Sequence, residues 1–207
     1  MTLRAIRRFA ALATLALGGL ACGRPAALDV PFLLETGSPP RPPAATLVIT
    51  SGRNEARLRG IRYTADWTTN PAVVRTAPPI PVPWPDATPT GGSTQANLEF
   101  ATTFLPDIVV VHAYASVAEA SREPEGAPLA THECSGSAEP KCEFSQTPTA
   151  VRVHLLGADI LAGKYLTVFA IWHVPLVQRE TSHASPQVSA SWLFRADREH
   201  ILGVSTP

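Results

Sequence analysis

The chain has few residues of several kinds. Its 207 residues include two lysines, one methionine and 16% charged side chains, against roughly 25% in an average globular protein. Positive and negative charges balance, so the formal net charge is zero. Without a surplus of positive charge we expect no nucleic-acid partner. No apolar run reaches the roughly 18 residues that a membrane-spanning helix needs.

Local catalytic motifs are also missing. The sequence has no Gly-x-Ser-x-Gly turn that would present an activated serine, and no glycine-rich phosphate loop ahead of a helix. Nucleophilic catalysis and nucleotide binding therefore have no motif to support them. We expect a non-enzymatic protein that needs no cofactor.

The first 22 residues have the pattern of an export signal. Three arginines precede a twelve-residue apolar stretch, Phe9 to Leu20, which is too short to span a bilayer. Ala21 and Cys22 follow. A cysteine directly after small and apolar residues at this point resembles the lipobox of bacterial lipoproteins. That resemblance implies that Cys22 carries lipid and begins the mature chain.

Export to the bacterial cell envelope follows from this signal. With lipid on Cys22, the protein would be held at a membrane outside the cytoplasm, because two or three acyl chains anchor a protein stably. The alternative is an ordinary signal peptide, cut after Ala21, which would release an unlipidated secreted protein.

The remaining cysteines agree with export. Cys134 and Cys142 are separated by seven residues in a polar stretch, and an even pair in an exported chain predicts a disulfide that closes a short loop. The alternative is a metal site that adds His132 and Glu133. This spacing matches no known zinc motif, so we favour the disulfide.

Proline content divides the mature chain. Residues 23–43 contain six of the 21 prolines, and such a stretch is extended and cannot form a core. We therefore predict a signal peptide over 1–22, a proline-rich tether over 23–43 and one folded domain over 44–207. A domain of this size buries roughly 70% of its unfolded surface.

The domain reads as a series of strands. No segment shows a helical period over three turns, whereas short β-branched or alternating runs recur between turns rich in glycine and proline. These runs are 46–50, 56–67, 94–100, 108–114, 151–155, 165–174 and 188–194. Gly60 marks a change of parity within the second run, which indicates a β-bulge. Residues 71–93 and 116–148 read as irregular segments.

Seven or eight strands in one domain predict an antiparallel β-sandwich of immunoglobulin-like type. One local detail favours that type. Leu161, Gly163 and Tyr165 resemble the tyrosine corner of immunoglobulin-like domains, in which the tyrosine hydroxyl bonds to backbone just upstream. We expect Tyr165 to be buried, with its hydroxyl bonded to backbone near residues 159–161.

A wider resemblance covers scattered positions of 44–196. Its elements are the string from Gly60 to Trp67 (GIRYTADW), a proline-rich middle, a strand at 98–100, and Gly163 to Tyr165 leading to Trp172. In this order they resemble small, uncharacterised bacterial envelope lipoproteins. The resemblance implies a β-sandwich in the envelope and brings no catalytic residues with it.

Histidines provide the alternative function. His112, His154 and His173 each lie within a predicted strand, and imidazoles from neighbouring strands suit zinc or copper. A metal-binding envelope protein is therefore the second hypothesis, although isolated histidines are the simpler interpretation and no metal site is assigned.

Tryptophans are the remaining candidates for binding. Trp67, Trp172 and Trp192 alternate within strands and predict core packing. Trp84 lies between prolines, where we expect it to pack back on the domain. The partner of the protein, whether another protein or a glycan, stays open.

Overall fold

A computed structural model describes residues 37–69, 72–89, 95–135, 142–156, 159–179 and 185–197. The predicted signal peptide, Cys22 and most of the predicted tether lie outside these ranges. None of the described helices is both long and apolar enough to cross a membrane.

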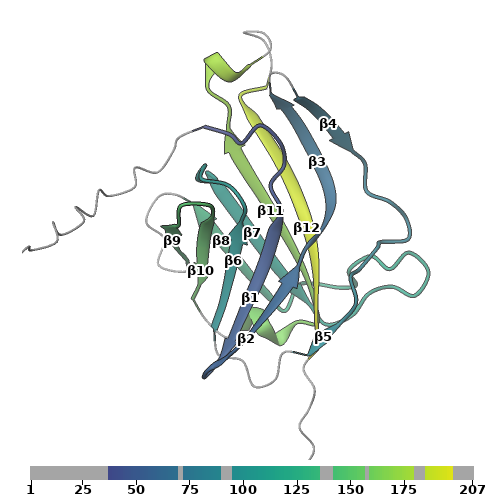
Figure 1. Cartoon of the computed structure of the whole chain (residues 1–207). Helices are drawn as coiled ribbons and strands as arrows, with labels where there is room; N and C mark the ends of the chain where they lie inside the picture. Colours follow the sequence, from purple (N-terminus) through teal and green to yellow (C-terminus); the bar gives the residue numbers. More distant parts are fainter. Residues whose placement is uncertain are drawn as a thin grey trace, which may run out of the picture. The chain divides into compact units, whose positions relative to one another are not determined.

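The described residues form an all-β structure built on two sheets, as the alternating runs predicted (Figure 1). The five-stranded sheet has the order β2-β1-β6-β10-β9 and is antiparallel throughout. Its strands are β1 (Ala45–Ser51), β2 (Asn54–Arg59), β6 (Gln95–Phe100), β9 (Cys142–Gln146) and β10 (Val151–Leu155).

The second sheet, called the large sheet below, has the antiparallel order β4-β3-β12-β11-β7-β8. Its strands are β3 (Ile61–Thr69), β4 (Ala72–Thr76), β7 (Ile108–Tyr114), β8 (Ala130–Ser135), β11 (Tyr165–His173) and β12 (Gln187–Asp197). A short strand, β5 (Thr88–Pro89), pairs in parallel with the end of β12. Two 3₁₀ turns, η1 (Asp159–Ala162) and η2 (Leu176–Gln178), flank β11.

Alternation along the strands creates the core between the sheets. Leu166, Val168, Ala170 and Trp172 of β11 point inward and are at most 1% exposed. Apolar side chains of both sheets join one cluster because each strand presents every second residue to the same face. Burial of this shared face is the main source of stability of such a fold.

Aromatic rings fill the centre of this core. The ring centroids of Trp67 and Trp172 are 5.3 Å apart, and Phe100 lies 5.4 Å from Trp172 and 5.2 Å from Trp192. The indole Nε1 of Trp67 donates to the carbonyl oxygen of Pro39 at 3.1 Å, so its polar atom is satisfied. The predicted core role of the three tryptophans is confirmed.

Gly60 is where the chain passes from one sheet to the other. It lies between β2 and β3, which belong to different sheets, and an added Cβ would come within 2.6 Å of the Phe194 ring. The bulge predicted at Gly60 instead lies at Tyr63, because Thr64 and Arg62 pair with the adjacent residues Ser191 and Trp192. The change of alternation at Gly60 therefore marks the point where the chain crosses from one sheet to the other.

The described strands number twelve, more than the seven or eight predicted. Strands β4 and β5 arise within 71–93, and β8 and β9 arise within 116–148, which the sequence presented as irregular. These segments are rich in proline or polar residues, so most of their strand structure depends on pairing with neighbours rather than on local propensity. Strand β4 is the exception, because Val73 and Val74 give it a local β-branched signal.

The end of the predicted tether packs on the domain. Ser38, Pro39, Pro42 and Pro43 are buried. Both the backbone N–H and the hydroxyl of Ser38 donate to the side-chain oxygen of Gln178 at 3.2 Å. Ser38 is therefore fixed to the end of the large sheet at which β11 ends.

A second apolar cluster lies on the outer face of the large sheet. Trp84, 6% exposed, and Val82 cover Leu193 of β12. The Trp84 Nε1 donates to the carbonyl oxygen of Arg122 at 2.7 Å. Packing of Trp84 back on the domain is therefore confirmed, and the proline-rich loop covers a sheet face.

Tyr165 belongs to this second cluster. Its ring lies 5.0 Å from that of Trp84, and the Arg195 guanidinium carbon is 5.6 Å from its centroid. The ring is half-buried on the outer face of β11. Among the described residues, no hydrogen bond joins its hydroxyl to the backbone of 159–161. Tyr165 thus lies on the opposite face from the one that the tyrosine-corner prediction requires.

The other two residues of that predicted corner have structural roles. Leu161 is 2% exposed in η1, which packs against β7 and β8. An added Cβ on Gly163 would lie 2.6 Å from the Ala113 Cβ and 2.8 Å from the Tyr114 nitrogen. Glycine at 163 therefore permits a backbone contact that seats the start of β11 against β7.

Candidate functional site

Polar side chains gather on the outer face of the five-stranded sheet. Strand register places Glu99 of β6 directly opposite Arg152 of β10, and Arg152 opposite Ser145 of β9. One row further along, Asn97 of β6 is opposite His154 of β10. Because directly opposite residues share a face, the sheet brings these five side chains together.

Glu99 is the centre of a charged network. Its carboxylate accepts hydrogen bonds from Arg57 of β2 and from Arg152, including the Arg152 Nε at 3.0 Å. The Glu99 side chain is only 12% exposed, whereas those of Arg57 and Arg152 are 50% and 36% exposed. The carboxylate thus fixes two arginines that still face solvent.

The network changes the acidity of Glu99. Burial alone would raise its pKa, but the hydrogen bonds from Arg152 and Arg57, together with their charges, outweigh it and lower the pKa. A carboxylate with a lowered folded-state pKa stabilises the fold above its unfolded pKa of about 4.3. This stabilisation disappears as the pH falls through the folded-state pKa.

We expect Glu99→Gln to lower the free energy of unfolding at pH 7 by about 1–2 kcal/mol, because two charge-assisted hydrogen bonds are lost. Below the folded-state pKa the wild type is protonated as well, so the two unfolding curves should converge. Denaturant melts at a series of pH values from 7 downward measure this. Glu133→Gln is the control, since Glu133 is exposed on β8 of the large sheet. A gap that stays constant over the whole series would contradict the pairing.

Three further polar side chains continue the face as a hydrogen-bonded line. The Nε2 of His154 lies 2.8 Å from the Ser145 hydroxyl, and its Nδ1 lies 2.8 Å from the Asn97 amide oxygen. With the imidazole neutral, the Asn97 oxygen accepts from Nδ1–H and the serine hydroxyl donates to Nε2. The order of groups is that of a nucleophile, a base and an orienting residue.

Nucleophilic catalysis would need more than the hydrogen-bonded line of Ser145, His154 and Asn97. A reacting serine needs donors for the developing oxyanion. The residue directly opposite Ser145 is Arg152, whose Nε and Nη2 already bond to Glu99. The serine also lies on a strand, without the sharp strand-to-helix turn that exposes an activated hydroxyl. The arrangement is therefore better suited to presenting ordered donors and acceptors to a bound partner.

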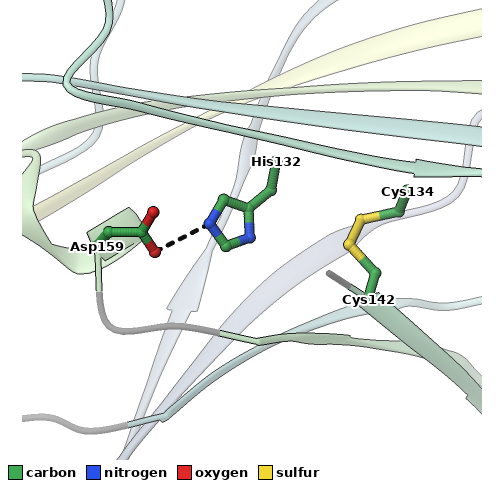
Figure 2. Close-up of a disulfide and its surroundings, with 4 residues drawn as sticks. All are labelled: His132, Cys134, Cys142 and Asp159. Atoms are coloured by element: carbon green, nitrogen blue, oxygen red, sulfur yellow. Dashed lines mark hydrogen bonds and ion pairs between the residues drawn. A yellow bond between two sulfur atoms is a disulfide. The ribbon is translucent and has the colours of Figure 1, made fainter. Parts of the chain in front are cut away.

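The predicted disulfide is present and lies at the edge of both sheets (Figure 2). Cys134 is on β8, the last strand of the large sheet, and Cys142 is on β9, the last strand of the five-stranded sheet. Their Cα atoms are 5.5 Å apart. The bond therefore joins the two sheets along one side, beyond closing the local loop.

A buried histidine accompanies this disulfide. His132 is 3% exposed and its Nε2 donates to the Asp159 carboxylate at 3.0 Å, as Figure 2 shows. Burial would raise the pKa of Asp159, but the hydrogen bond and charge of His132 and nearby backbone N–H groups hold it below its usual value. This pair ties η1 to β8, and its role is structural.

The three strand-borne histidines do not meet. His112 of β7 and His173 of β11 belong to the large sheet, and His112 is opposite Thr167, six residues from His173. His154 belongs to the other sheet. In the described part of the chain, no three His, Cys, Asp or Glu side chains form a group able to hold a metal ion. The geometry therefore gives the metal hypothesis no support.

Sequence reasoning missed the network around Glu99. Alternating polar residues such as Asn97 and Glu99 mark a solvent-facing side, and this signal is visible in the sequence. Their partners on β9 and β10 are more than 40 residues away, and only strand register brings them together.

Comparison with known proteins gives no match to a family model, to a curated protein or to a solved structure.

Proposed function

We propose that the protein is a lipid-anchored, extracytoplasmic module of the bacterial cell envelope, built on an antiparallel β-sandwich. Its role is non-enzymatic. It binds a protein or glycan partner through the outer face of the five-stranded sheet. The observation that carries this proposal is the ordered polar network there, in which Glu99 fixes two partly exposed arginines beside the line from Ser145 to Asn97.

Fixed polar groups favour recognition because less side-chain entropy is lost on binding. An arginine held by a carboxylate keeps its remaining N–H donors available for an acceptor on the partner. The side chains of Arg57 and Arg152 are accessible enough for such contacts. Anchoring rests on the resemblance of the segment ending at Cys22 to a lipobox, and the alternative stays a secreted, unlipidated form.

For the anchor, we expect Cys22→Ser to move the protein from the membrane fraction to the soluble or secreted fraction, because the thiol is the acylation point. Cell fractionation and mass measurement of the mature chain test this. Cys134→Ser with Cys142→Ser is the control, and it should leave the anchor in place. Membrane partitioning that survives Cys22→Ser would contradict lipidation.

For the binding face, a photoreactive residue at Glu143 should form specific cross-links in the intact envelope. Glu143 is exposed and lies opposite His154. The same residue at Phe169, exposed on the outer face of the large sheet, is the matched control. Equal cross-linking from both positions would contradict the assignment. Labelling of Ser145 by a fluorophosphonate, lost in Ser145→Ala, would show that the role is enzymatic.

A further inference from the structure

Exposed apolar side chains lie on two sides of the end of the large sheet where the predicted tether attaches. Leu176 and Val177 of η2 are 68% and 91% exposed, and Val73 of β4 is 62% exposed. Val177 is one of the most exposed large apolar residues of the described chain. Large aliphatic groups left in water at a turn often mark a contact surface when they occur together.

The tether passes between these groups. On one side, Ser38 bonds to Gln178, the residue after Val177. On the other side, the hydroxyl of Thr69 donates to the carbonyl oxygen of Pro40 at 3.2 Å, and Val73 pairs with Thr68, next to Thr69. Residues 37–40 are therefore held between η2 and the hairpin of β3 and β4.

We propose that this apolar tip, defined as Val73, Leu176 and Val177, dips into the lipid bilayer to which the chain is anchored. The inference rests on the proposed lipid anchor at Cys22. Fourteen residues separate Cys22 from Gly37, so the two lie at most about 50 Å apart when the chain between them is fully extended. The anchor therefore keeps the tip within reach of the membrane surface.

Because the domain is tethered to the membrane, a small apolar surface is sufficient for docking on it. Three aliphatic side chains would give only weak binding to vesicles on their own. A short covalent link raises the effective concentration of the second contact to roughly millimolar, so docking becomes an intramolecular event. Docking would orient the domain, with the tip at the membrane and the start of β11 away from it.

The surroundings of the tip suit a lipid surface. The guanidinium of Arg179, next to Gln178, donates through Nε to the carbonyl oxygen of Val174 at 2.9 Å. Arg41 is exposed on the tether segment, and Arg75 of β4 is exposed beside its partner Asp66. Cationic side chains near an inserted apolar tip are attracted to anionic lipid head groups.

The test uses the full lipidated chain with Val177→Cys, labelled with an environment-sensitive dye, in vesicles of phosphatidylethanolamine and phosphatidylglycerol. Cys22 carries lipid and the other cysteines are paired, so the dye has one site. We expect a blue shift of the emission and quenching by spin-labelled lipids. Leu129→Cys is the control, because Leu129 is 56% exposed and bonds to Ala113, at the opposite end of the large sheet.

Further variants separate the outcomes. Leu176→Asp should abolish the blue shift at Val177, whereas Leu129→Asp should leave it unchanged; neither residue is buried. An acylated chain that floats with vesicles while the Val177 dye stays in water would overturn the tip and leave the anchor intact. A mature chain without acyl mass would overturn the anchor itself. A shift that appears without vesicles and grows with protein concentration would identify a second copy as the partner and exclude the membrane.

Discussion

Gly163→Ala is expected to lower the free energy of unfolding by about 3 kcal/mol, because the added methyl overpacks a rigid contact. The Cβ of an alanine at 163 would lie 2.6 Å from the Ala113 Cβ. It would also lie within 2.9 Å of two backbone atoms of β7, the Tyr114 nitrogen and the Ala113 carbonyl carbon. Backbone atoms cannot rotate away, so β11 or β7 must shift. The hydrogen bond from the Lys164 nitrogen to the Tyr114 oxygen at 2.9 Å would lengthen in consequence.

Denaturant unfolding measures this loss. Gly52→Ala is the matched control: no atom lies within 4 Å of its added Cβ, and its φ is +58°. That control should lower the free energy of unfolding by only about 1 kcal/mol, because a residue with a Cβ is disfavoured in the left-handed conformation by about that amount. Equal losses at the two positions would show that space at 163 is not the determining factor.

Trp84→Ala is expected to produce the second large effect, a loss of about 3 kcal/mol together with release of the proline-rich loop. Trp84 is 6% exposed and packs on Tyr165. Its Nε1 bonds to the Arg122 oxygen, and the Val82 nitrogen bonds to the Ser121 oxygen at 2.9 Å. This small cluster and these two bonds therefore hold the loop, together with the pairing of β5 with β12.

Release should be local at first. Because the second cluster lies outside the main core, we expect backbone amides at 82 and 84 to lose hydrogen-exchange protection while β6 and β11 keep theirs. Trp84→Phe should restore most of the packing without the Nε1 bond. Uniform loss of protection across both sheets would show instead that the loop unfolds only with the whole domain.

Local pattern was sufficient for much of the fold. The alternating run at 165–174 predicted a strand, which β11 is, although it did not tell which of its two faces packs in the core. The short spacing of Cys134 and Cys142 in an exported chain predicted the disulfide between them. In each case the information lies within a few neighbouring residues, where a period of two or a short loop determines geometry.

Other features depended on contacts that no local pattern describes. The alternation along β11 identifies the strand but does not reveal what covers its outer face. There Tyr165 packs against Trp84, which lies 81 positions earlier in the chain. The tyrosine-corner prediction was made from neighbouring residues, whereas the ring packs against a distant loop.

The sequence by itself determined the all-β class, the strand at 165–173, the tryptophan core and the disulfide, because each follows from alternation or from short spacing along the chain. Only the tertiary structure decided that Gly60 carries the chain between sheets, that Cys134 and Cys142 join two sheet edges, and that Glu99 is held by Arg57 and Arg152. The physical reason is register. Which residues of separate strands become neighbours depends on how all strands pair and on which faces are buried together, and that pairing is a property of the folded chain as a whole.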